Sequence, residues 1–247
     1  MNSPKHFVAC CYLLLLLTIL TRPAHAQQLP DSAAYTQRST ADIQSFVQSR
    51  LGPDPRLYNG YEYIRNGIPA KGFPFFDSAA LQTGTLTYDG IFYQDLPLEY
   101  DVVSDQVVIA DYTAKSLISL ISQKVAHFSI GPHPFRYINA EKTTLPKTGF
   151  YEELYAAGPA ALLARHEKKL VFSSNREEQA KYYSDDTYFL ELDGKFYRVD
   201  GEDALLDVLK DKKDVLKKYI RDNKIRFRRN LEKALIQTTA YYLQIRN

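Results

Sequence analysis

The stretch 84–111, with the sequence GTLTYDGIFYQDLPLEYDVVSDQVVIAD, constrains the fold more than any other part of the chain. Asp89-Gly90 separates two runs of alternating apolar and polar residues. This dipeptide is typical of two-residue hairpin turns, because both of its residues adopt positive φ. Counting outward from the turn places Tyr88 opposite Ile91. A second reversal at Ser104-Asp105 leads into another apolar run, so the pattern predicts an antiparallel β-meander.

A second hairpin is predicted over 187–200, where Asp193-Gly194 again separates two alternating runs. Segments with short apolar runs between the two hairpins are expected to form further strands: 124–130, 135–140, 149–155 and 160–172. Residues 160–172 also fit a helix that begins with a proline, so both interpretations are kept. The polar residues 173–186 are interpreted as a loop.

Helical periodicity is found near the two ends of the chain and in one short central segment. The predicted helices cover residues 40–51, 113–123, 212–223 and 230–244. The first has Thr40 as its cap and ends at Gly52-Pro53, and Asp211 is expected to cap the third. Together these elements predict an α+β fold: a mostly antiparallel β-sheet, with a meander and two Asp-Gly hairpins, an N-terminal helix and C-terminal helices.

Residues 1–26 resemble a secretory signal peptide in composition. Lys5 precedes an apolar run, and Ala24-His25-Ala26 matches an A-x-A cleavage site. The alternative is an uncleaved anchor helix, which the shortness of the apolar run disfavours. A lipoprotein signal is disfavoured because its cysteine should follow the apolar run, whereas Cys10 and Cys11 precede the run LLLLLTIL. We therefore predict export, to the periplasm, to the outer membrane or to the medium.

The remainder of the chain is predicted to form one domain. Residues 27–38 are polar and are expected to be flexible. Residues 39–247 are expected to form a single α+β domain, β-rich over 84–200 and helical over 202–245. Cleavage after Ala26 removes both cysteines, one lysine and one arginine, so the mature chain has zero formal net charge and cannot form disulfides. This charge argues against nucleic acid as a partner, and we expect no transmembrane segment after cleavage.

Motifs for catalysis are not found in the sequence. A G-x-S-x-G elbow is lacking, and nothing in the spacing of His127, His133 and His166 selects a serine partner. The H-E-x-x-H and paired-cysteine patterns of zinc sites are also lacking. We therefore predict no catalytic residue and no cofactor.

Acidic residues are concentrated in the meander. Asp101, Asp105 and Asp111 are weak candidates for calcium ligands, because carboxylate oxygens suit calcium outside the cell. The sequence lacks the D-x-D-x-D-G loop, however, and aspartate is also favoured in turns for backbone reasons. We prefer the structural interpretation and predict no metal site.

Candidate surfaces for a ligand or partner are of two kinds. The aromatic candidates are Phe73, Phe75, Phe76, Tyr93 and Tyr100. The run 73–76 could stack on a ligand, but such clusters more often close one end of a sheet. The basic candidates are Lys212, Lys213, Lys217, Lys218, Arg221, Arg226 and Arg228. They belong to the segment 210–233, which has eleven basic and four acidic residues. This charge fits three interpretations: binding of an anionic partner, a solvated helix face, or docking on the acidic meander.

Two runs in the chain resemble uncharacterised secreted or envelope proteins of Bacteroidota. The run YFLELDGKFYRVDGEDALLDVLKDKKDVLKKYIRDNKIRFRRNLEKALIQTTAYY, residues 188–242, is similar to their C-terminal part. Residues 84–109 are similar to their central part. The resemblance covers about half of the mature chain and carries no named active-site motif. It implies an exported or cell-envelope protein of a Gram-negative bacterium.

These observations lead to one functional hypothesis and two alternatives. We expect an exported, non-enzymatic cell-envelope protein that binds an apolar or amphipathic ligand, such as a lipid, or a partner protein of the envelope. A curved antiparallel sheet backed by helices is the geometry of periplasmic lipid carriers, which is an analogy at the level of the fold. The alternatives are an extracytoplasmic hydrolase and a structural or interaction module that uses the basic C-terminal helices.

Overall fold

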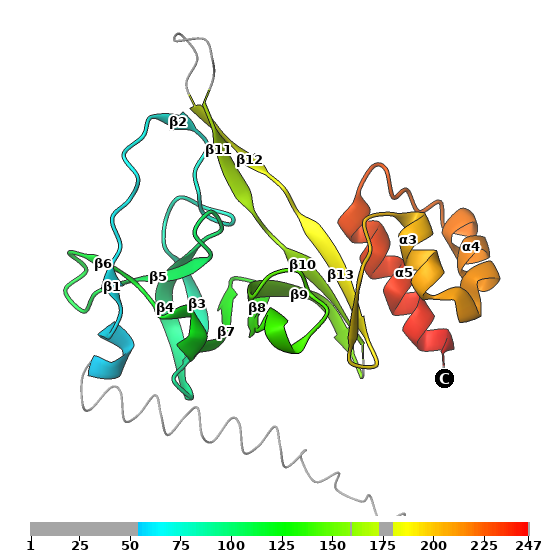
Figure 1. The fold of residues 1–247 in the computed structure, drawn as a ribbon, viewed down its shortest axis with the longest axis horizontal. Coiled ribbons are helices and arrows are strands. Elements are labelled where there is room, and N and C mark those ends of the chain that lie inside the picture. Colours follow the sequence, from blue (N-terminus) through cyan, green and yellow to red (C-terminus); the bar gives the residue numbers. More distant parts are fainter. Residues whose placement is uncertain (1–53, 159, 173–179, 247) are drawn as a thin grey trace, which may run out of the picture. The chain divides into compact units, whose positions relative to one another are not determined.

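The computed structural model describes residues 54–158, 160–172 and 180–246 (Figure 1). These residues are mostly antiparallel β structure followed by three α-helices, which confirms the predicted α+β class at this coarse level. The predicted signal peptide 1–26, the segment 27–38 and the helix over 40–51 lie outside the described residues.

Eleven strands form the main sheet, in the order β1-β6-β5-β4-β3-β7-β8-β9-β10-β13-β14, and all neighbours are antiparallel. Their bounds are β1 (Tyr61–Glu62), β3 (Gln82–Tyr88), β4 (Ile91–Asp101), β5 (Gln106–Ala110), β6 (Leu117–Ser119), β7 (Val125–Ile130), β8 (His133–Ile138), β9 (Gly149–Ala157), β10 (Ala160–Arg165), β13 (Thr187–Leu192) and β14 (Lys195–Arg198).

A smaller sheet has the order β11-β12-β2, in which β12 and β2 are parallel. Its strands are β2 (Ala70–Lys71), β11 (Lys168–Val171) and β12 (Ala180–Ser184). The helices are α3 (Glu202–Val208), α4 (Lys213–Asp222) and α5 (Leu231–Ile245), with short 3-10 turns η1 (Pro55–Tyr58), η2 (Ser122–Lys124), η3 (Ala140–Lys142) and η4 (Lys210–Lys212).

Asp-Gly turns connect two of the hairpins. Asp89-Gly90 lies between β3 and β4 with φ values of 51° and 79°, and Tyr88 pairs with Ile91 across the turn. Asp193-Gly194 lies between β13 and β14 with φ values of 50° and 75°. Positive φ at both positions matches the twist of antiparallel strands, which is why glycine follows aspartate in each turn.

Residues 160–172 are extended, so the strand interpretation of this segment is confirmed. All six residues of β10 are buried, because β10 lies between β9 and β13 and helix α5 packs against it. A strand that is buried on both faces carries a continuous apolar run. Such a run does not show the two-residue period that distinguishes strands from helices in a sequence.

Two large apolar clusters fill the structure. In the first, the rings of Tyr100, Phe128, Phe135 and Phe150 pack with centroid distances of 4.6 to 5.7 Å. In the second, the C-terminal helices cover β10 and β13 (Figure 1) through buried leucines: Leu162, Leu190, Leu205, Leu206, Leu216 and Leu235. Both clusters are built from residues between 57 and 245, so the described residues supply their own core.

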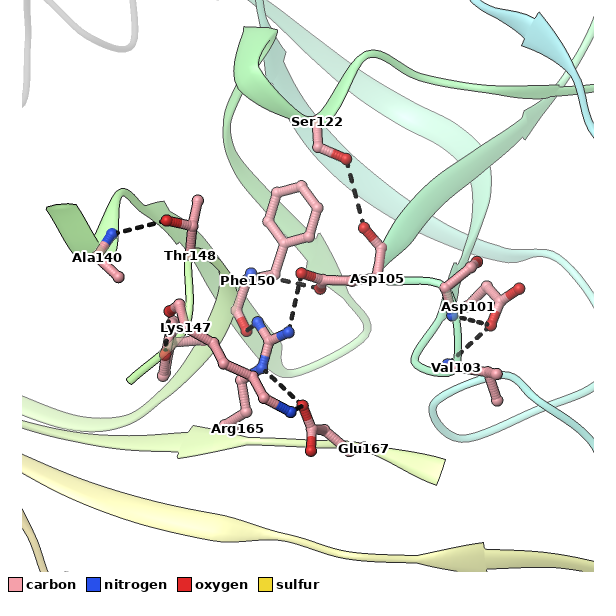
Figure 2. A network of polar contacts seen from close by, with 12 residues as sticks. Asp101, Val103, Asp105, Ser122, Ala140, Lys147, Thr148, Phe150, Arg165 and Glu167 are labelled. Carbon is pink, nitrogen blue, oxygen red and sulfur yellow. Dashed lines mark hydrogen bonds and ion pairs between the residues drawn. The ribbon is translucent and has the colours of Figure 1, made fainter. Parts of the chain in front are cut away.

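Arg165 at the end of β10 ties distant parts of the main sheet together (Figure 2). Its side chain is almost fully buried, and Nη2 lies 3.0 Å from Asp105 Oδ2 while Nη1 donates to the carbonyl of Phe150 at 3.2 Å. Gly149 passes so close that a Cβ there would lie 1.9 Å from Asp105 Oδ2, and its φ is 145°. Only glycine satisfies both conditions.

The helix predicted over 113–123 is wrong. Strand β6 and the turn η2 occupy this region. Ile118 of β6 pairs with Ile109 of β5, and β1 pairs with the other edge of β6. The carboxylate of Asp111 accepts hydrogen bonds at 2.9 and 3.2 Å from two backbone N–H groups of the turn that precedes β6. Pairing with β5 on one side and with the distant β1 on the other therefore outweighs the local helical period.

Two smaller predictions are also wrong. Within 173–186, β12 is a strand rather than a loop, because it pairs with β11 and β2. Asp211 does not cap a helix: α4 begins at Lys213 without a side-chain cap. The Asp211 carboxylate instead accepts a hydrogen bond at 3.2 Å from the hydroxyl of Tyr242 on α5. The pairing of β12 with β2 and the contact of Asp211 with Tyr242 both join residues that are distant in sequence.

Candidate functional site

Strands β11 and β12 continue the hairpin of β10 and β13 into the smaller sheet (Figure 1), and we call them the arm. The two strands stay hydrogen-bonded where they leave the main sheet, since the N–H of Asp185 donates to the carbonyl of Glu167 at 2.8 Å. Residues 166–167 and 185–186 therefore form the joint between the main sheet and the arm.

Three titratable side chains meet at this joint because of strand register. Glu152 on β9 pairs with Phe135 of β8 and Ala164 of β10. His133 lies two residues before Phe135, and His166 lies two residues after Ala164. Since side chains two residues apart share one face of a strand, both imidazoles lie on the same face as the carboxylate of Glu152.

Each carboxylate oxygen of Glu152 contacts one imidazole. Oε1 lies 2.6 Å from His133 Nδ1, and Oε2 lies 2.6 Å from His166 Nε2. The second nitrogen of His166, Nδ1, lies 2.9 Å from Asp186 Oδ1. The ring of Phe76 packs against both imidazoles, with centroid distances of 5.1 and 4.8 Å. We call Glu152, His133, His166 and Asp186 the histidine–carboxylate cluster.

The contacts within the cluster favour the charged forms of His166 and Glu152. Burial alone would lower the pKa of His166, but hydrogen bonds with Asp186 and Glu152 outweigh burial and raise the pKa to about 9. Burial would raise the pKa of the Glu152 carboxyl, but hydrogen bonds with the two histidines outweigh it and hold that pKa below its ordinary value. At neutral pH, His166 is therefore an imidazolium between two carboxylates.

This arrangement suits stabilisation better than nucleophilic catalysis. The cluster borders a pocket of about 200 Å³ that Ser184 and Lys168 also line. A serine nucleophile needs a neutral histidine with a free ring nitrogen, whereas carboxylates hold both nitrogens of His166. The Lys168 ammonium donates to the backbone carbonyls of Phe75 and Phe76, so it fixes the loop before β3 against the arm.

The aromatic candidates lie mainly in the core. Three of them are at most 3% exposed, which removes them as a ligand surface: Phe75, Tyr93 and Tyr100. Phe76 packs edge-on against Phe135 with a centroid distance of 5.1 Å, and Lys168 lies 4.4 Å above the ring of Phe73. The run 73–76 therefore packs within the protein, which agrees with the interpretation that such a cluster closes one end of a sheet rather than stacking on a ligand.

The three aspartates considered as calcium ligands form hydrogen bonds or ion pairs with other groups of the protein. Asp101 Oδ1 accepts hydrogen bonds from the N–H groups of Val103 and Ser104 at 2.9 and 3.1 Å. Asp105 pairs with the buried Arg165 (Figure 2), and Asp111 stabilises the turn before β6. In the part of the chain that the structure describes, no group of three or more His, Cys, Asp or Glu residues is placed to hold a metal ion.

A groove of about 440 Å³ lies between the arm and the first edge of the main sheet, and we call it the tyrosine groove. Its lining includes Tyr61, Tyr63, Ile64, Asn66, Asp101, Val103, Gln106 and Tyr182. Tyr61 and Ile64 are 73% and 80% exposed, which is unusual for large apolar side chains in one groove. The Tyr63 hydroxyl donates to Asp101 Oδ2 at 2.8 Å, so this ring is held in place.

The basic candidates lie on α4 and on the segments around it. Lys213 pairs with Asp207 at 2.6 Å, and Arg221 pairs with its neighbour Asp222 at 3.3 Å. None of the ion pairs among the described residues joins these candidates to the acidic meander. The four other exposed candidates are Lys217, Lys218, Arg226 and Arg228.

Neither the histidine–carboxylate cluster nor the tyrosine groove was predicted from the sequence. His133 and His166 are 33 positions apart in the numbering of the chain, and only the pairing of β8, β9 and β10 brings them together. The groove depends on Tyr182 of β12, and β12 lies within the segment 173–186 that was interpreted as a loop. The local signals for a shared face are the two-residue spacings from His133 to Phe135 and from Ala164 to His166.

No family model, curated protein or solved structure matches this chain. No helix among the described residues is long and apolar enough to cross a membrane. The function is therefore inferred from the geometry of the groove, the cluster and the charged surface.

Proposed function

We propose that this chain is an exported, non-enzymatic protein of the cell envelope that binds an amphipathic ligand or a partner protein in the tyrosine groove. The groove carries the proposal, because exposed aromatic and aliphatic side chains surround a concave volume of about 440 Å³ on an otherwise well-packed structure. Export is supported by the composition of residues 1–26.

The lining of the groove favours an amphipathic ligand over a fully apolar one. The rings of Tyr61 and Tyr182 offer flat apolar faces, while Asn66 and Gln106 offer amide groups beside them. Aromatic rings and the C-terminal helices fill the faces of the sheet, which argues against a lipid chain inside the fold. A surface site is the better match.

A hydrolase has less support. His166 is protonated at neutral pH and has no free ring nitrogen, and His127 is exposed without an ion pair among the described residues. The histidines contact Glu152 and Asp186 rather than the aspartates of the meander. His166 therefore cannot serve as the base that acyl transfer needs for its first step.

The test is native mass spectrometry of residues 27–247, exported by a Gram-negative host and purified from the periplasm without detergent. The wild-type chain is expected to carry an adduct that is lost on denaturation. Two substitutions in the groove, Tyr61→Ala and Tyr182→Ala, are expected to weaken binding together by about 30-fold, since each ring contributes on the order of 1 kcal/mol.

The matched control combines Tyr112→Ala and Tyr183→Ala. Tyr112 is 72% exposed and Tyr183 is 50% exposed, and neither lines the groove. Tyr183 follows Tyr182 on β12 and points to the opposite face. An adduct that is absent from the wild-type chain, or equal in all variants, would refute binding in the groove.

A further inference from the structure

A dense set of cations lies at the end of α4 and in the segment that connects it to α5. Seven of the thirteen residues from 217 to 229 are basic and one is acidic. All seven basic side chains are exposed: Lys217, Lys218, Arg221, Lys224, Arg226, Arg228 and Arg229. We call these seven residues the basic surface.

The connecting segment is fixed by apolar residues that alternate with the cations. Ile225 and Phe227 are each 8% exposed and belong to the apolar cluster beneath the helices. Arg226 lies between these two apolar residues, Arg228 follows Phe227, and both arginines are exposed. The backbone N–H of Ile225 also donates to the carbonyl of Ile220 at 3.0 Å. The buried anchors therefore hold the arginines outward on an ordered backbone.

Intramolecular partners do not neutralise this charge. Among the described residues, Arg221 forms the one ion pair of the basic surface, a 3.3 Å contact with the adjacent Asp222. By contrast, Arg165 is paired with Asp105, and Lys213 is paired with Asp207. Uncompensated cations at this density repel one another, so an external anion would relieve that repulsion.

We propose that the basic surface docks on an anionic lipid bilayer. The seven charges are spread along a helix end and a connecting segment rather than directed at one point, which fits a plane of many phosphate groups better than a single small anion. Val215, 45% exposed on the same helix, adds an apolar side chain beside the charges. The zero net charge of the mature chain makes this a local attraction rather than a property of the whole protein.

The experiment is co-sedimentation of residues 27–247 with vesicles. One set contains equal parts of phosphatidylglycerol and phosphatidylcholine, and the other contains phosphatidylcholine alone. The variant carries Arg226→Gln and Arg228→Gln. Each basic residue near an anionic bilayer strengthens binding about 5-fold, so the variant is expected to bind the anionic vesicles about 25-fold more weakly. Raising the salt from about 0.05 M to about 0.5 M is expected to release the wild-type chain.

The matched control carries Lys115→Gln and Lys142→Gln. These substitutions remove the same number of positive charges at two exposed positions outside the basic surface. This control is expected to bind like the wild-type chain. Circular dichroism checks that every variant is folded. The proposal would be overturned if the wild-type chain bound both vesicle types equally. It would also be overturned if the variant and the control lost the same amount of binding to the anionic vesicles. Retention on a heparin column without vesicle binding would also overturn it, and would assign the basic surface to a soluble acidic partner.

Discussion

Raising the pH from about 6 to about 9.5 is expected to weaken the fold through one residue, His166. Its imidazole is 11% exposed, and both nitrogens contact carboxylates, those of Glu152 and Asp186. The folded chain therefore holds the proton more tightly than the unfolded chain does. A group whose pKa is raised by folding stabilises the protein fully below its unfolded pKa, and this contribution is lost as the pH rises through the folded pKa.

The magnitude follows from the shift. The pKa of His166 rises from 6.5 to about 9 on folding. Each pKa unit corresponds to about 1.4 kcal/mol, so protonated His166 contributes about 3 kcal/mol to the free energy of unfolding below pH 6.5. The contribution declines between pH 6.5 and 9. Solvent screening removes little of it, since the side chain is nearly buried.

Urea denaturation of the wild-type chain and of His166→Gln measures this contribution directly. Glutamine keeps a hydrogen-bond donor but cannot carry the charge. The difference in unfolding free energy between the two proteins is expected to be about 3 kcal/mol near pH 6 and to shrink toward pH 9.5. The exposed His127 provides the control, because His127→Gln should leave the free energy unchanged across this range. A difference that stays constant with pH would refute the argument.

Two further outcomes concern the network around Arg165 and the meander turns. Gly149→Ala is expected to lower the unfolding free energy by about 2–4 kcal/mol in thermal denaturation, whereas Gly67→Ala, with no atom within 4 Å of the added Cβ, should be neutral. Asp101→Ala is expected to cost about 1–3 kcal/mol because two backbone N–H groups lose their acceptor, whereas Asp101→Asn keeps that acceptor. An equal loss in both Asp101 variants, or a rise in melting temperature with calcium in the wild-type chain, would contradict this assignment.

Local rules predicted the parts of the fold that depend on neighbouring residues. The positive φ of Asp89-Gly90 and the opposition of Tyr88 and Ile91 follow from turn chemistry and a two-residue period. Helix α5 (Leu231–Ile245) lies within one residue of the predicted 230–244 at each end, and its cap is Asn230, which was predicted as the first helical residue. Such features need no knowledge of distant strands.

The missed features depend on pairing with strands outside the local window of sequence. Residues 113–123 have a helical pattern, yet β6 forms because β5 and β1 offer hydrogen-bond partners on both sides. Glu152 gains two histidine neighbours only once β8 and β10 flank β9. The register of an eleven-stranded sheet is not encoded in any single window of the sequence. The cluster and the groove therefore required the structure.

The joint at the base of the arm links the two sites described above. Tyr182 is carried by the arm, whereas Tyr61 and Ile64 belong to the opposite wall of the tyrosine groove. Tyr182 lies four residues before Asp186, whose carboxylate pairs with His166 at 2.9 Å across the base of the arm. The histidine–carboxylate cluster therefore holds the base of the strand that carries Tyr182 into the groove.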